Sequence, residues 1–227
     1  GAGQNAAFAL EAHLVHGAHD LRAVARASTL GLAKGPHATR YYSYRHLSQF
    51  RSPRPPGEKA LSISGSERLC RLLGYKPDKI QSADYPEANM LDLPFAGDSF
   101  DAVVSDQVLE HVEGNPFDAV REGFRVLKPG GLFVLATCLM VPIHKRPGDY
   151  WRFTPDGLEH ICRPYGDVID VGSWGNPAFL VYSELGLRFV PVPHAKWHPL
   201  HWVATWNHPE WAIFTWVVCR KKSAPQK

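Results

Sequence analysis

The sequence predicts an α/β fold built on a parallel sheet, and residues 93–135 supply the main observations. Ala102–Val104 is a short apolar run, as expected of a strand that is buried on both faces. Asn115-Pro116 then offers an N-cap and a first-turn proline for a helix that Lys128–Gly131 ends. Leu132–Leu135 is a second apolar run. Strand, helix, glycine turn and strand in this order form a right-handed crossover unit.

The composition is that of an ordinary globular protein. The chain has 227 residues, 44% of them hydrophobic and 21% charged, which suits one domain with appendages. A formal net charge of +3 is too small to favour nucleic acid as a partner. The four cysteines are scattered without a CxxC pair, which favours reduced thiols and a cytoplasmic protein. We expect neither a signal peptide nor integral membrane contact.

Two motifs within this stretch resemble a known family. SFDAVVSDQVLEHV, followed by FRVLKPGGLFVL, resembles the fourth strand, next helix and fifth strand of class I S-adenosylmethionine-dependent methyltransferases, in a type 11-like domain. The resemblance runs from about Lys59 to Ile161. It implies a Rossmann-like sheet of seven strands in the order 3-2-1-4-5-7-6, with the last strand antiparallel. It also implies S-adenosyl-L-methionine as the cofactor.

The N-terminal region reads as a helical appendage. Ala6–Leu32 is alanine-rich and predicts one helix, or two short helices joined near Gly17. Tyr41–Arg45 precedes a proline-rich linker at 52–57. In the family such helices commonly cover the cofactor, although simple packing on the core is the alternative for each tyrosine. We expect a cap and linker over 1–57, a methyltransferase domain over 58–222 with an aromatic insertion at about 174–211, and a tail over 223–227.

The first strand and its glycine loop depart from the family pattern. Lys59–Ile63 predicts a strand, and Ser64, Gly65 and Ser66 follow it. The family has a D-x-G-x-G-x-G pattern here, whereas this chain keeps one glycine and has Ser62 at the acidic position. The resemblance implies that Ser64, Gly65 and Ser66 bind the methionine part of the cofactor. A plain strand-to-helix turn is the alternative.

The second strand ends at a candidate ribose ligand. Ile80–Asp84 reads as a strand, and the resemblance implies that Asp84 accepts hydrogen bonds from both ribose hydroxyls. An Asx turn before Pro86 is the alternative. Asn89 matches the family's adenine-facing residue, and Met90 packs either on the adenine or in the core. Ser105, Asp106 and Gln107, at the end of the fourth strand, also face the expected cofactor.

The loop after the fifth strand contains the candidate catalytic residues. Its PIHxxPxDYWRFTPxGL pattern resembles a methyltransferase subgroup associated with bacterial polysaccharide or glycan biosynthesis. His144 could accept a hydroxyl proton and Asp149 could orient it, while Tyr150 and Arg152 would bind the substrate. Pairing of Arg152 with Asp149 or Asp106 is the structural alternative. His111 is a second candidate base, although the family's LEH pattern favours a structural role.

The C-terminal part completes the sheet and contains an aromatic insertion. Val168–Val171 and Ala212–Cys219 predict strands six and seven, and Thr154-Pro155 begins a helix. The insertion is rich in tryptophan and has histidines at His194, His198 and His201. Because no cysteine or carboxylate cluster completes a ligand set, we expect no metal. The tryptophans could line a pocket, form a homodimer surface, touch a membrane interface or, as we favour, form a small aromatic core.

The sequence therefore predicts a methyltransferase that transfers a methyl group to an oxygen of a small molecule or of a sugar or glycan precursor. Catalysis would consist mostly of positioning, with His144 assisting deprotonation. The alternative is a non-catalytic, methyltransferase-like binding or scaffold protein, because the SISGSE loop has lost most of the family's glycines.

Overall fold

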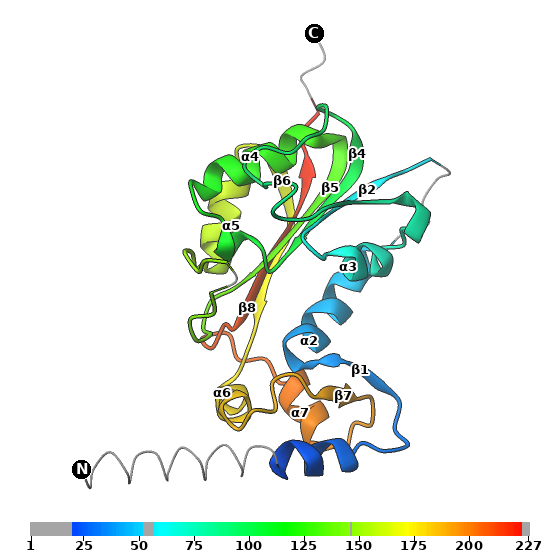
Figure 1. Ribbon diagram of the computed structural model, residues 1–227, viewed down its shortest axis with the longest axis vertical. Helices are drawn as coiled ribbons and strands as arrows, with labels where there is room; N and C mark the ends of the chain where they lie inside the picture. Colours follow the sequence, from blue (N-terminus) through cyan, green and yellow to red (C-terminus); the bar gives the residue numbers. More distant parts are fainter. Residues whose placement is uncertain (1–19, 52–56, 146, 224–227) are drawn as a thin grey trace, which may run out of the picture. The chain divides into compact units, whose positions relative to one another are not determined.

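The computed structural model describes residues 20–51, 57–145 and 147–223 (Figure 1). The chain divides into two compact units. The smaller unit joins the N-terminal segment, up to Ser43, to Gly175–Trp211, and the larger unit joins Tyr44–Trp174 to the segment that begins at Ala212. The smaller unit thus contains residues 175–211, the range of the aromatic insertion.

The larger unit is built on a six-stranded sheet in the order β3-β2-β4-β5-β8-β6. β3, β2, β4 and β5 are parallel, whereas β8 runs antiparallel to both of its neighbours, β5 and β6. This arrangement confirms the Rossmann-like class and the antiparallel last strand. The strands are β2 (Ala60–Ile63), β3 (Ile80–Ala83), β4 (Phe100–Asp106), β5 (Leu127–Cys138), β6 (Gly166–Trp174) and β8 (Phe214–Lys221).

The predicted count of seven strands is wrong by one, since the described part of the chain forms no third family strand beside β3. The segment that would form it makes a local turn instead. The Asn89 side chain accepts a hydrogen bond from the Leu91 amide at 2.9 Å, and the Asn89 carbonyl accepts one from the Asp92 amide at 3.0 Å. An asparagine that bonds its own neighbours in this way competes with strand pairing. Without this strand the observed order otherwise matches the prediction.

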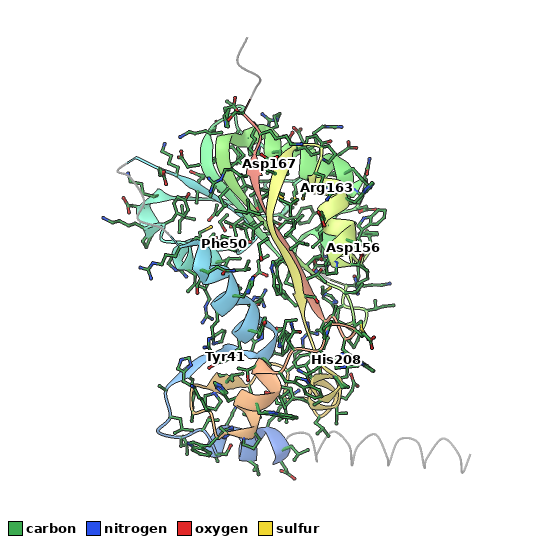
Figure 2. The ribbon with its side chains drawn as sticks, turned by 180° about the vertical axis from the view of Figure 1, so that it is seen from behind. Tyr41, Phe50, Asp156, Arg163, Asp167 and His208 are labelled. Carbon is green, nitrogen blue, oxygen red and sulfur yellow. The ribbon has the colours of Figure 1, made fainter. Side chains whose placement is uncertain are left out.

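Of three helices of the larger unit, α4 and α5 begin where the sequence predicts, at Pro116 and Pro155. α3 (Glu67–Leu72) packs on β2, β3 and β4, while α4 (Pro116–Val126) and α5 (Pro155–Cys162) lie side by side (Figure 1). The Asn115 and Thr154 side chains cap α4 and α5, as predicted, by accepting amide hydrogen bonds. Asp156 and Arg163, labelled in Figure 2, place charges at the two ends of α5 that complement its dipole.

Two elements of the N-terminal region were not predicted. β1 (Lys34–His37) and α2 (Ala38–Leu47) occupy the stretch that the sequence suggested only as a tyrosine-rich connection. α2 lacks a clear apolar stripe, so its periodicity gave no signal. Residues 20–27 are helical, but most of the predicted alanine-rich helix, including Gly17, lies outside the described residues, as does the linker 52–56.

The smaller unit pairs β1 with β7 (Pro191–Pro193) and adds α6 (Pro177–Glu184) and α7 (Pro199–Thr205). The buried Tyr41, labelled in Figure 2, places its hydroxyl 2.9 Å from His194 Nδ1 and 3.3 Å from His201 Nδ1. His198 instead caps α7. These histidines thus hold local structure, while Trp197 and Trp202 lie exposed. Within residues 20–51, 57–145 and 147–223, no helix has the length and apolar character to cross a bilayer.

We predict that Gly123→Ala destabilises the larger unit by about 1–3 kcal/mol, the usual range for overpacking. An added Cβ would lie 2.8 Å from Cε2 of the buried Phe133 ring, so α4 or β5 would have to shift. Urea unfolding followed by circular dichroism measures the change. Gly157→Ala in α5 is the matched control, because its Cβ would meet only ordinary contacts from 3.4 Å. Equal or greater stability of Gly123→Ala would show that α4 tolerates a wider separation.

Candidate active site

A cavity of about 550 Å³ opens at the carboxyl ends of β2, β3 and β4. Ile63 pairs with Ala83 on one side and Ser105 on the other, so the residues that follow these strands meet at one edge. The cavity is lined by residues from the three strand ends, the turn after β3, the segment after β4 and the loop after β5: Ser64, Asp84, Tyr85, Ala88, Asn89, Met90, Gln107, Val108, His111, Val112, Glu113 and Pro147.

The glycine loop is tied to the end of β3. Ser64 and Gly65 both have positive φ, at 44° and 84°, and the Gly65 amide donates to Asp84 Oδ1 at 3.1 Å. A Cβ at Gly65 would meet nothing within 4 Å, so the backbone conformation rather than space requires glycine here. The Ser64 hydroxyl accepts the Tyr85 amide at 3.4 Å. Ser64 and Asp84 therefore fix each other's segments at the cavity wall.

Ser66 lies beneath the cavity rather than on its wall. Its hydroxyl is fully buried, donates to the Ile63 carbonyl at 2.6 Å and accepts the Asp106 amide at 2.9 Å. These two bonds connect the ends of β2 and β4. The Ser66 hydroxyl thus donates its proton within the fold. Ser64, in contrast, lines the cavity.

Ser105 and Asp106 are likewise buried behind the wall. The Ser105 hydroxyl donates to Met90 Sδ at 3.8 Å, which holds Met90 at the cavity. The Asp106 carboxylate accepts a hydrogen bond of 2.5 Å from the Tyr44 hydroxyl, and the Arg68 guanidinium lies 5.8 Å from the Tyr44 ring centre. This tyrosine–aspartate pair was not predicted, because α2 itself was not predicted.

Gln107 has the most unusual geometry on the wall. Its φ is 62°, a left-handed conformation that is uncommon for a residue with a side chain, and its amide donates to the Ala136 carbonyl at 2.9 Å. The buried Nε2 has no hydrogen-bond partner among the described residues. Strain and an unused buried donor at one residue are typical of a ligand-binding position.

His111 reaches the cavity from the short helix η3 (Leu109–His111). Its Nδ1 lies 2.5 Å from the Gly148 carbonyl, which can only accept, so Nδ1 holds the proton. In the neutral ring the lone pair is then on Nε2. His144 packs edge-on against His111 with 5.0 Å between ring centres, but it is not among the described residues that line the cavity.

The predicted loop residues form a buried ion pair. The Arg152 guanidinium donates to both oxygens of Asp149, whose side chain is only 1% exposed, and the His144 amide donates to Asp149 Oδ2 at 2.8 Å. The Arg152 hydrogen bonds lower the pKa of Asp149, and the pair raises the pKa of Arg152. This is the structural alternative considered for Arg152. Tyr150 is 48% exposed, and its amide donates to the Glu110 carbonyl at 2.8 Å.

Comparison with known proteins identifies the domain that contains this cavity. The family described as a methyltransferase domain matches residues 56–135. That range covers β2, β3, β4, most of β5 and most of the cavity wall. Over residues 56–135 the chain is therefore similar to class I S-adenosylmethionine-dependent methyltransferases. The cofactor of this family is S-adenosylmethionine, as the resemblance implied.

Relatives and solved structures agree with this assignment. An uncharacterized methyltransferase of Mycobacterium tuberculosis is 31% identical over 131 residues, which are 56% of this chain and 49% of the relative. The match thus spans about half the length of that protein. Two structures share the fold at a TM-score of 0.53. The first is from the Haloferax volcanii complex of the Trm112 methyltransferase activator with a methyltransferase; it is 17% identical and covers 83% of this chain and 92% of that chain. The second is the [4+2]-cyclase SpnF, which is 15% identical and covers 86% of this chain and 88% of that chain.

A third structure, a Haemonchus contortus phosphoethanolamine N-methyltransferase in complex with S-adenosylmethionine, has a TM-score of 0.50. It is 15% identical and covers 80% of this chain and 52% of that chain. At these identities the three structures show the fold alone. SpnF is named as a cyclase, so this fold also hosts chemistry other than methyl transfer.

We predict that Asp149→Asn lowers the stability of the methyltransferase domain by about 1–3 kcal/mol at neutral pH, since Arg152 loses its ionised partner. Because the folded-state pKa of Asp149 is depressed below the usual 3.8, its contribution is complete above that value and is lost as the pH falls through the folded pKa. Urea unfolding at pH 7 and at pH 3 measures both effects. The exposed Asp78→Asn is the control, because Asp78 is 68% exposed, and an Asp149→Asn protein as stable as the wild type at pH 7 would contradict the prediction.

Proposed function

We propose that this chain transfers a methyl group from S-adenosylmethionine to an oxygen of a small molecule, of the sugar or glycan-precursor class. The cavity supports this best, because it brings together five of the side chains expected to hold the cofactor, within a methyltransferase domain. They are Ser64, Asp84, Asn89, Met90 and Gln107. The bound cofactor would supply an electrophilic methyl group on its sulfonium.

Each wall residue has a chemistry that fits one part of the cofactor. Asp84 offers carboxylate oxygens for the ribose hydroxyls, while its Oδ1 also accepts the Gly65 amide. Asn89 lies in the turn after β3, where it would face the adenine, and Met90 offers a polarisable surface for the ring. Gln107 offers an unused donor, Nε2, for the amino-acid part of the cofactor.

We assign the general base to His111 rather than to His144. His111 lines the cavity, and the Gly148 carbonyl fixes the tautomer that leaves Nε2 able to accept a proton. His144 packs against His111, and Asp149 holds the His144 backbone, so this pair would position the base. Tyr150 and Arg152, in the same loop as His144, would bind the acceptor. An oxygen acceptor suits a neutral histidine base, because a hydroxyl proton must leave during transfer.

The second candidate is a binding or scaffold protein that does not transfer methyl groups. One observation favours it: the loop's single glycine directs its amide at Asp84 rather than at a ligand. The Ser66 hydroxyl is also used within the fold. Binding of S-adenosylmethionine without turnover of any acceptor would support this candidate.

We predict that Asp84→Ala weakens S-adenosylmethionine binding by roughly 1–3 kcal/mol, the cost of leaving buried polar partners unpaired. Isothermal titration calorimetry with the purified chain measures the change. Asp78→Ala is the matched control, because Asp78 is 68% exposed and pairs only loosely with Lys79, at 3.8 Å. A folded Asp84→Ala protein with unchanged affinity would remove Asp84 from the ribose site.

We predict that His111→Ala lowers turnover by about 10²–10⁴-fold, the range for a positioned general base, and leaves cofactor affinity nearly unchanged. The assay screens hydroxylated sugars and metabolites for methylation, and His160→Ala, an exposed helix position, is the control. If His144→Ala loses turnover over this range while His111→Ala stays active, the base is His144 as the sequence first suggested. Full activity of both variants would mean that catalysis relies on proximity alone.

A further inference from the structure

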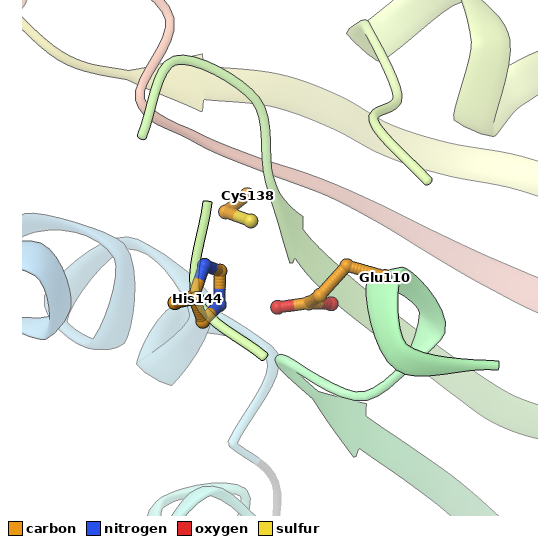
Figure 3. A group of neighbouring side chains, drawn as sticks. All are labelled: Glu110, Cys138 and His144. Atoms are coloured by element: carbon orange, nitrogen blue, oxygen red, sulfur yellow. The ribbon is translucent and has the colours of Figure 1, made fainter. Parts of the chain in front are cut away.

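Three side chains with metal-binding atoms converge beside the predicted catalytic loop. Glu110 belongs to η3, Cys138 is the last residue of β5, and His144 lies in the following loop. One ligand atom from each lies within 4.8 Å of the other two (Figure 3). Figure 3 shows the Glu110 carboxylate and the His144 ring turned toward one another, with the Cys138 sulfur beside them. Among the described residues this is the one group of its kind.

The Glu110 carboxylate is unusual because it is buried and only partly used. The residue is 0% exposed, and its Oε2 accepts the Thr137 hydroxyl at 2.7 Å. Its Oε1 is buried without a hydrogen-bond partner in the described part of the chain. Because an unpaired buried oxygen is costly, this atom calls for a water, a ligand or an ion as its partner.

The other two side chains complete the cluster around Glu110. Cys138 is 1% exposed, so its sulfur is shielded from solvent beside the Glu110 carboxylate. The His144 Nδ1 lies 3.1 Å from the Pro142 carbonyl and 3.5 Å from Asp149 Oδ2, so Nε2 is the nitrogen left with a lone pair. A carboxylate behind the far nitrogen is how zinc-binding histidines are commonly oriented.

We propose that Glu110, Cys138 and His144 form a Zn²⁺ site. A carboxylate, a thiolate and an imidazole are all zinc ligands, and three protein ligands leave a fourth position open. Bonds of about 2.0–2.3 Å would place tetrahedral ligand atoms roughly 3.3–3.8 Å apart, so the side chains must close by about 1 Å. The His144 side chain, 30% exposed, has room for that movement. This site goes beyond methyl transfer and needs no cofactor to form.

The test is metal binding by the whole chain after treatment with a chelator. Titration with Co²⁺, as a spectroscopic substitute, should give one ion per chain and an absorption band for charge transfer from thiolate to cobalt. Competition with a chromophoric chelator then gives the Zn²⁺ affinity. Calorimetry with S-adenosylmethionine on the same samples keeps failure of this site distinguishable from failure of the proposed function.

Substitutions assign the ligands. Cys138→Ser should abolish the charge-transfer band, and Glu110→Gln, which keeps its shape and its bond to Thr137, should weaken Zn²⁺ binding by at least about 100-fold. Thr137→Val removes only the outer hydrogen bond and should weaken it by about 10–100-fold. Cys70→Ser, at another buried cysteine, is the matched control. Circular dichroism and unfolding midpoints show whether each variant is folded.

Two results would overturn the proposal. One is the absence of a thiolate band in the folded wild-type chain under Co²⁺ saturation. The other is Zn²⁺ affinity that is equal in wild type, Cys138→Ser and Glu110→Gln, since such an ion would be held by other groups, such as surface histidines. Loss of Zn²⁺ binding in both variants, with binding retained in Cys70→Ser, would establish the site.

Discussion

The in-register pairing of β2 with β3 and β4 is the constraint on which the rest of the structure depends. Because Ile63 pairs with both Ala83 and Ser105, β2 and β3 end level with each other, and β4 ends one residue later, at Asp106. Ser64, Asp84 and Gln107 follow these three strand ends directly. A slip of one residue would reverse the side chains of a whole strand. It would also remove these residues from a common wall. The position of the cavity therefore depends on strand register more than on the conformation of any loop.

The loop after β5 depends on a second constraint, which is the attachment of its backbone to η3. The Glu110 carbonyl accepts amides from Tyr150 and Trp151 at 2.8 and 3.2 Å, and the Trp151 indole donates to the Val112 carbonyl at 2.9 Å. The buried ion pair of Asp149 with Arg152 joins two residues within the loop and fixes its backbone. A polar segment is thereby held in one conformation beside the cavity, as a preorganised site requires.

The sequence predicted the parts of the fold that follow from local pattern. The crossover unit around α4 and its Asn115 cap are confirmed because apolar runs and capping residues act over a few positions. The antiparallel last strand, which the family resemblance implied, is confirmed as well. Two elements were not predicted. One is α2, which lacks an apolar stripe. The other is the turn at Asn89, where a side-chain hydrogen bond replaces the third family strand. At the site, spacing predicted which residues follow the strands. It could not predict burial, and so could not separate the cavity-lining Ser64 from the buried Ser66.

The position of β8 has a consequence for how the chain is made. β6 pairs only with β8 among the described strands, and β8 comes about 40 residues later, after the segment Gly175–Trp211. During synthesis β6 therefore leaves the ribosome without a partner and waits until β8 has emerged. Its backbone amides and carbonyls stay open to other chains for that interval. Translation speed through residues 175–221 would then set how long an unfinished sheet edge is exposed in the cell.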